Sequence, residues 1–270
     1  MLIVEWLQDE LGEPRTGLRL HAYLEVIKPG WSTYVRCATK ADLLAAIDSA
    51  ASTGKILHIE SHGNDEGIDD GSGNEFLSWD ELTPVLQSLN EASGCNLLVF
   101  MAACAGFAGI LALAQGPRAP AVALVGPAVK LSAYESVEAA KAFYRPLVGG
   151  TAHLQAMADA STWESGVLFE PEPIAILAWE SWVQKMIIDA RQANRQARIE
   201  RSRDRLMKAG YSKSKTDALL SSFDESEAHV AQLAWDRFFM LDKHPSNASR
   251  FGVDFVEIAR KIAAFYYRGF

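Results

Sequence analysis

The 270-residue sequence is poor in cysteine: it has three, Cys37, Cys95 and Cys104, and none forms a Cys-x-x-Cys pair. An odd number without that spacing argues against a disulfide framework and against a cysteine-based zinc site. Reduced thiols are typical of cytoplasmic proteins, so we expect a cytoplasmic localisation and a cysteine that is available for chemistry.

Long apolar runs are also missing. Although 49% of the residues are hydrophobic, no stretch of 18 or more apolar residues occurs, so no membrane-spanning helix is predicted. The N-terminal stretch 1–14 lacks the basic region and the small-residue cleavage site of a signal peptide, and we interpret it as a strand. Internal repeats and low-complexity tracts are absent as well.

The net charge of −8 is distributed unevenly. Residues 1–160 contain 10 basic and 19 acidic residues, whereas residues 161–270 contain 16 basic and 15 acidic ones. Together with the break at Glu170–Pro173, this asymmetry predicts two regions, 1–165 and 166–270.

A β-α-β unit is predicted within residues 55–106. Two apolar runs, 56–59 and 96–101, suit strands that are buried on both faces of a parallel sheet. Between them, apolar residues recur at helical spacing over 77–92, after a cap formed by Ser78 with Glu81. Such strands lie parallel and side by side, or nearly so, and end at the same edge of the sheet.

Each run is followed by a reactive side chain. His62 follows the first strand and Cys104 the second, so we expect the two residues to meet in space. A neighbouring histidine can take the proton of a thiol, and a helix over 106–115 would lower the pKa of the Cys104 thiol further. The backbone N–H groups of Gly63 and Cys104 could then hold an oxyanion.

These motifs carry a resemblance to a known family. The stretches SHGNDEGI at 61–68 and AACAG at 102–106 resemble the His-Gly and cysteine motifs of caspase-like (clan CD) cysteine peptidases. The caspase pattern Q-A-C-[RQG]-G is approached but not met, since Ala102 replaces Gln and Ala105 occupies the variable position.

The following residues are similar to the bacterial CHAT branch of that family. A strand at 121–126, an acidic helix at 136–147, a Gly turn at 149–150 and an Ala-rich helix at 151–160 resemble its pattern. The resemblance implies a caspase-like three-layer α/β sandwich with a mostly parallel sheet. It further implies His62 as general base, Cys104 as nucleophile, no metal or other cofactor, and a specific protein target in a bacterial defence or death-like pathway.

Three residues near the motifs are candidates for a substrate pocket. Asp65 and Glu66 belong to an acidic loop that either is merely solvated or borders the cleft and favours basic substrates. Lys130, beyond the strand that follows Cys104, would instead favour acidic ones.

His58, Glu60 and His62 alternate along one strand, so they project to the same face. An alternative to the peptidase interpretation is a metal held by two histidines and a carboxylate. The other possibility is that His58 or Glu60 forms hydrogen bonds around His62 or points into an interface covered by a helix.

Four further elements are expected outside this unit. Residues 2–6 and 34–37 are predicted strands, and residues 40–51 a helix. Residues 19–27 alternate only weakly between apolar and polar and end at the turn-forming Pro29-Gly30.

From residue 174 onwards the pattern is helical throughout, with predicted helices at 213–222, 225–241 and 253–267. The arginine-rich stretch 191–205 predicts an exposed, salt-bridged arm. Nucleic-acid binding is the weaker interpretation, because acidic residues interrupt the stretch and the chain is acidic overall. The region also contains aromatic residues that could anchor it to the sheet domain or remain available to a partner: Trp179, Trp182, Trp235, Phe238 and Phe239.

Two functional hypotheses follow. The first is a cytoplasmic cysteine endopeptidase that uses His62 and Cys104, with protein or peptide as substrate and no nucleic-acid or membrane partner. The alternative is a catalytically silent caspase-like scaffold that binds a protein partner through its helical region.

Overall fold

The computed structural model describes residues 1–8, 15–50, 55–104, 106, 109, 118–127, 130–151, 166–169, 195–220, 223–258 and 260–261. The chain divides into two compact units, Met1–Pro171 and Glu172–Phe270. Within the described ranges, no helix has both the length and the apolar character that crossing a membrane requires.

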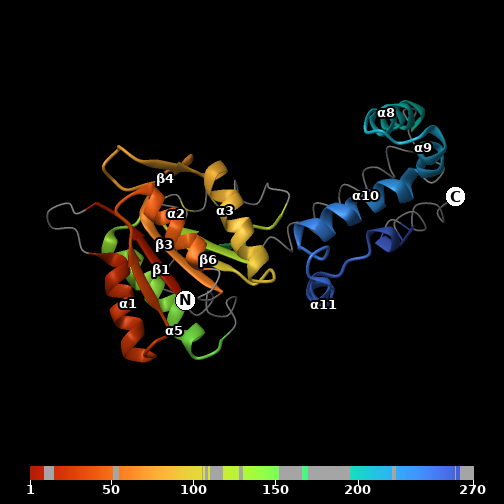
Figure 1. Cartoon of the computed structure of the whole chain (residues 1–270). Coiled ribbons are helices and arrows are strands. Elements are labelled where there is room, and N and C mark those ends of the chain that lie inside the picture. The colour runs from red at the N-terminus through yellow and green to blue at the C-terminus, as the bar shows by residue number, and fades with distance from the viewer. Residues whose placement is uncertain are drawn as a thin grey trace. The chain divides into compact units, whose positions relative to one another are not determined.

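The first unit is built on a mostly parallel sheet (Figure 1). The strands follow the order β2 (Thr33–Arg36), β1 (Leu2–Trp6), β3 (Ile56–Gly63), β6 (Leu98–Ala102), β7 (Ala123–Pro127) and β8 (Gly166–Phe169). Neighbours from β2 to β7 run parallel, and β8 is antiparallel to β7. Every residue of β1, β6 and β7 is buried, which explains why these strands are almost wholly apolar.

Helices cover both faces of this sheet (Figure 1). They are α1 (Thr16–Ile27), α2 (Lys40–Ser49), α3 (Trp79–Ala92) and α5 (Ala133–Val148). Successive strand residues point to opposite faces, so Val4 packs in the core under α2 and α3, and Ile3 in the core under α1 and α5. The predicted three-layer α/β sandwich with a mostly parallel sheet is confirmed.

Helix α3 begins with the capping box that the sequence predicts. The Ser78 hydroxyl accepts a hydrogen bond from the Glu81 N–H, and the Glu81 carboxylate accepts one from the Ser78 N–H. Lys40 Nζ also donates to Glu81 at 2.7 Å. The Lys40 hydrogen bond and then those of Ser78 lower the pKa of Glu81 to about 2.

The weak alternation over residues 19–27 gave no indication of a helix, yet this stretch lies within α1. The helix buries Leu20 and Leu24, which are one turn apart, but also exposes apolar residues, including Val26 at 83%. These exposed apolar side chains blur the 3.6-residue period. Gly17 permits close packing, since a Cβ there would lie 2.8 Å from a carboxylate oxygen of Glu5.

The acidic loop after His62 contains structure that the sequence analysis missed. β4 (Gly67–Asp69) pairs antiparallel with β3 and with β5 (Phe76–Ser78). Strands of three residues are too short for a periodic pattern, so only the pairing of β4 with β3 and of β5 with β4 reveals them.

The predicted region 166–270 is not wholly helical. Gly166–Phe169 form β8, which extends the sheet of the first unit through its ladder with β7. The division of the chain accordingly falls after Pro171 rather than after residue 165. A four-residue apolar segment cannot be distinguished from a helical turn by periodicity alone.

The elements that the structure describes in the second unit are helices. Their bounds are α8 (Arg195–Lys208), α9 (Lys213–Leu220), α10 (Phe223–Phe238), the 3₁₀ helix η2 (Pro245–Asn247) and α11 (Ala248–Phe251). Trp235 and Phe239 are fully buried in a core of this unit, where Trp235 Nε1 donates to the Phe251 carbonyl at 2.6 Å. Trp235 and Phe239 therefore pack within this unit's own core, which excludes for them one of the uses that the sequence left open for its aromatic residues: availability to a partner.

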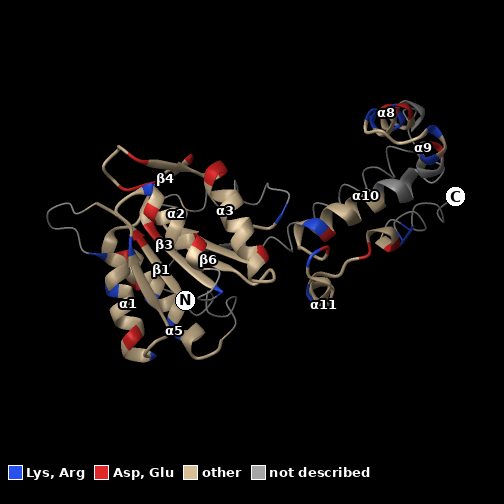
Figure 2. Cartoon of the chain, viewed as in Figure 1, with Lys and Arg blue, Asp and Glu red and all other residues tan. Residues whose placement is uncertain are grey.

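Basic residues are numerous along α8 (Figure 2). Arg201 and Arg205 are exposed, and Arg203 lies 3.5 Å from Asp217 of α9 in an ion pair. This agrees with the predicted salt-bridged arm over this part of the stretch 191–205. Residues 191–194, the aromatic residues Trp179 and Trp182, and the predicted helices over 106–115 and 151–160 lie wholly or mostly outside the described residues.

Candidate active site

His62 and Cys104 lie at the same edge of the sheet. β3 and β6 are adjacent and parallel, and their register pairs Glu60 with Ala102. β6 ends at Ala102, and Cys104 lies in the turn two residues beyond it, at the edge of the sheet where β3 presents His62. Adjacent strands are separated by about 4.8 Å, so the fold brings these distant positions into proximity.

Close backbone packing at this edge explains the small residues around the cysteine. A Cβ on Gly63 would lie 2.8 Å from the Cys104 carbonyl oxygen, and one on Gly106 would lie 2.9 Å from the Met101 carbonyl oxygen. A Cβ on Gly126 of β7 would lie 3.1 Å from the Gly106 backbone. Larger residues at these three positions would push apart the strand ends that present His62 and Cys104.

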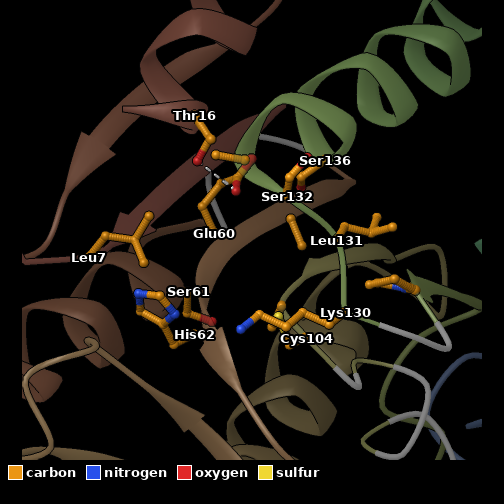
Figure 3. A pocket seen from close by; sticks show the side chains of 14 residues that line it. Leu7, Thr16, Glu60, Ser61, His62, Cys104, Lys130, Leu131, Ser132 and Ser136 are labelled. Carbon is orange, nitrogen blue, oxygen red and sulfur yellow. Dashed lines mark hydrogen bonds between the residues drawn. The ribbon is translucent and has the colours of Figure 1, made fainter. Parts of the chain in front are cut away.

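A pocket of about 260 Å³ opens at these strand ends (Figure 3). It is lined by Leu7, Thr16, Glu60, Ser61, His62, Ala102, Ala103, Cys104, Pro127, Lys130, Leu131, Ser132, Ala133 and Ser136. Two helices, α1 and α5, contribute their N-terminal residues to it. The carboxyl ends of the strands in a parallel sheet are where α/β proteins bind ligands.

The three cysteines differ in accessibility. Cys104 is half-buried at the pocket, whereas Cys37 and Cys95 are buried. Burial raises the pKa of Cys37 to about 11, which keeps that thiol protonated and unreactive. Access to solvent therefore distinguishes Cys104 from the other two.

The His62 ring packs against Gly71, in the loop after β4. A Cβ on Gly71 would lie 2.5 Å from Cδ2 and 2.7 Å from Nε2 of His62, so only glycine leaves room for the ring. Gly71 also has a φ of 84°, in the left-handed region that favours glycine. The position of this loop therefore limits where the imidazole can lie.

Asp70 holds the loop in place. Gln8, just beyond β1, donates from its side chain to Asp70 Oδ2 at 2.6 Å and from its backbone N–H to the Asp70 carbonyl at 2.9 Å. Ser72 donates to Asp70 Oδ1 through its hydroxyl and its N–H. Burial would raise the pKa of Asp70, but the hydrogen bonds of Ser72 and Gln8 outweigh it and the pKa is lowered.

A buried chain of hydrogen bonds reaches the pocket from beneath α5. The Tyr144 hydroxyl lies 3.0 Å from His58 Nδ1, and His58 Nε2 lies 2.8 Å from Glu60 Oε1. The hydroxyl of Thr16, in the first turn of α1, donates to Glu60 Oε2 at 2.9 Å. His58 also stacks on Phe100, with ring centroids 4.8 Å apart.

His58 and Glu60 thus bond to each other and to helical residues. Across the described ranges, no group of three or more His, Cys, Asp or Glu side chains is arranged to hold a metal ion. The metal interpretation of His58, Glu60 and His62 therefore finds no support, and His58 points into a helix-covered interface instead.

Of the three residues predicted to form a substrate pocket, one lines the pocket and two do not. Lys130 lines the pocket and extends toward Ser61 and His62 (Figure 3). Asp65 and Glu66 do not line it: both are exposed in the turn between β3 and β4, where their carbonyls accept hydrogen bonds from Trp79. Gly63 is beside Cys104 but is not part of the pocket lining either.

Sequence reasoning missed the polar residues that the helices add to the pocket: Thr16, Ser132 and Ser136. Thr16 is the first residue of α1, the helix that was not predicted, and Ser132 is recognisable only as a cap of α5. The Ser61 hydroxyl, 7% exposed as a residue, is also in the pocket wall and has no hydrogen-bond partner among the described residues. Nothing in the sequence distinguishes this serine from a structural one.

Comparison with known proteins yields no family: the sequence matches no protein-family model and no curated protein. The fold and the pocket therefore describe only a class of protein: an α/β sandwich with a histidine and a cysteine at the carboxyl ends of adjacent parallel strands.

Proposed function

We propose that this protein is a cysteine endopeptidase that uses His62 as general base and Cys104 as nucleophile. The observation that carries the proposal is that both side chains line one pocket, at the ends of adjacent strands β3 and β6. A half-buried Cys104 at the pocket supports an enzyme over the silent scaffold.

The reaction proceeds in two halves. His62 accepts the thiol proton, and the Cys104 thiolate attacks the carbonyl carbon of the scissile peptide bond. The tetrahedral oxyanion collapses when the His62 imidazolium protonates the departing amine, leaving a thioester on Cys104. His62 then takes a proton from water, whose oxygen attacks the thioester and releases the acid and the thiol.

Cellular context is part of the proposal. A cysteine nucleophile needs a reducing compartment, which suits the cytoplasm. The motif resemblance to CHAT proteins suggests one specific protein target in a bacterial defence or death-like pathway rather than general digestion. No metal or organic cofactor takes part in the reaction as written.

Alkylation of the native protein tests the nucleophile. We expect iodoacetamide at neutral pH to label Cys104 selectively, with the buried Cys37 and Cys95 as controls within the same molecule. Denatured protein should label at all three positions. His62→Ala should lower kcat/KM by about 10²- to 10⁴-fold, because a positioned general base contributes that much.

Proteolysis in cells tests the activity. Comparing newly formed N-termini in cells that express wild type or Cys104→Ala identifies the target. If native Cys104 does not react faster than Cys37, and the two proteins give the same N-termini, the peptidase proposal is wrong. The scaffold alternative would then be preferred.

The second unit is proposed to be a regulatory or partner-binding region. Its own aromatic core and the exposed arginines of α8 are what support this role. Replacing Arg191, Arg195 and Arg198 with Glu should leave folding and Cys104 labelling intact while changing recruitment of substrate or partner. Loss of thiol reactivity in that variant would show that the arm belongs to the catalytic unit.

A further inference from the structure

Glu60 gives the pocket a buried carboxyl group. The residue is only 2% exposed, and its carboxylate lines the pocket together with His62 and Cys104. Figure 3 shows Glu60 and Thr16 at one end of the pocket and Ser61, Cys104 and Lys130 at the other. A side chain that enters beside Cys104 therefore extends toward Glu60.

The contacts of Tyr144, His58 and Glu60 give one consistent set of donors and acceptors. Burial raises the pKa of Tyr144 well above its ordinary value, so this phenol keeps its proton and can donate it to His58 Nδ1. The other ring nitrogen of His58, Nε2, then donates to the Glu60 carboxylate. We assign this tautomer from the donors and acceptors.

The Glu60 carboxylate can still accept hydrogen bonds from a ligand. A carboxylate has about four acceptor positions, and His58 and Thr16 occupy one on each oxygen of Glu60. A cationic group at this end of the pocket would both satisfy a free position and neutralise a buried charge.

A second buried carboxyl group, that of Glu5, lies beside Glu60 in the sheet. Glu5 of β1 pairs directly with Glu60 of β3, and it accepts a hydrogen bond from the Leu18 N–H in the first turn of α1. Burial raises the pKa of Glu5, and the charge of Glu60 raises it further. The nearby cations Arg15 and Lys130 are both exposed, so water screens them more than it screens Glu60.

The remaining lining suits one long side chain. Leu7 and Leu131 flank the pocket in Figure 3 and can pack against an aliphatic stem. The volume of about 260 Å³ is below the roughly 300–1,000 Å³ of pockets for drug-sized ligands. The unpartnered Ser61 hydroxyl lies in the pocket wall on the Cys104 side, where its oxygen has almost no exposed surface.

We propose that Glu60 makes this pocket selective for lysine or arginine, so that the protein cleaves after a basic residue. This inference rests on the proposed function, because it places the basic side chain next to the bond that Cys104 attacks. It also assigns the selectivity to Glu60 rather than to the exposed acids of the loop after His62 or to Lys130.

Peptidyl acyloxymethyl ketones that differ in the residue next to the warhead test the inference on unaltered protein. We expect Cys104 to react about 10- to 100-fold faster with an arginine reagent than with the citrulline reagent, which has nearly the same shape but no charge. Equal rates, or a preference for an aspartate reagent, would overturn the inference.

Two variants identify the responsible carboxylate. Glu60→Gln should bring the arginine-to-citrulline ratio close to one. Glu66→Gln removes the same charge from the exposed turn, and the ratio should stay at its wild-type value. If Glu66→Gln abolishes the preference and Glu60→Gln does not, the loop and not the pocket selects the substrate.

A binding measurement separates this inference from the peptidase proposal. Calorimetry on the Cys104→Ala protein compares acetyl-arginine-amide with acetyl-citrulline-amide, and we expect about 10-fold tighter binding of the arginine compound. If Cys104 is unreactive but this difference is found, the peptidase proposal fails while the basic pocket specificity stands. Equal affinities would reject the specificity whether or not Cys104 reacts.

Discussion

Replacing Gly71 with alanine should displace the His62 imidazole. The added Cβ would lie 2.5 Å from Cδ2 and 2.7 Å from Nε2 of His62. Carbon atoms in contact are about 3.5–4.0 Å apart, so the ring or the loop has to move by about 1 Å. Because Asp70 ties the loop to Gln8, we expect the ring to give way.

A neighbouring glycine provides a matched control. Gly73 has a φ of 74°, close to the 84° of Gly71, but a Cβ there meets nothing within 4 Å. Alanine in this backbone region costs roughly 1–2 kcal/mol at either position, which corresponds to about 2–8 °C in Tm. The difference between the two variants therefore isolates the contact with His62.

The assay compares kcat/KM with Tm for both variants. Gly71→Ala should lose about 10²-fold in kcat/KM, the typical effect of a 1 Å misplacement of a catalytic group. Gly73→Ala should lose stability alone. Histidine side-chain NMR supplies a readout that needs no substrate: the His62 ring resonances should shift only in Gly71→Ala. Equal kinetics and equal His62 spectra in the two variants would refute the reasoning.

Three other predictions concern stability. The lowered pKa of Asp70 means that its stabilising effect is complete above its ordinary pKa of 3.8 and is lost as pH falls through the lower folded value. Asp70→Asn should therefore cost about 1–3 kcal/mol at pH 7, and this difference in urea unfolding should shrink toward pH 3; a constant difference would contradict it. Ser78→Ala should cost about 1 kcal/mol by removing the α3 cap, while Ser88→Ala, an exposed position in the same helix, should cost nothing in the same denaturation assay. Trp235→Ala should destabilise the second unit by about 3–5 kcal/mol; calorimetry should then show an early transition through which iodoacetamide still labels Cys104 alone, and labelling of the buried Cys37 and Cys95 in that transition would show that the two units do not fold separately.

Sequence patterns were sufficient where one property dominated a long segment. Apolar runs bounded by turn residues predicted β1, β3, β6 and β7, since strands buried on both faces cannot tolerate many polar side chains. The serine and glutamate that begin α3 predicted its start, because capping depends on residues three positions apart. The adjacency of β3 and β6 followed from the single crossover between them.

Patterns failed where an element was short or its exposed face was apolar. α1 exposes Val26, and β8 has four residues, so neither has a clear period. In the second unit, sequence alone could not determine that the aromatic side chains of Trp235 and Phe239 pack against each other and not outward. Burial depends on what other segments bring into contact.

The sequence by itself predicted the sandwich and the placement of His62 and Cys104 at one edge of the sheet, because long apolar runs mark the buried strands and a single crossover makes β3 and β6 neighbours. Only the tertiary structure decided that Lys130 lines the pocket and that Asp65 and Glu66 do not. It also decided that Glu60 lies in the pocket, held by Thr16 from a helix that begins 44 residues earlier. Such contacts join segments that are far apart in the chain. Local periodicity and residue propensity do not predict which distant segments come into contact.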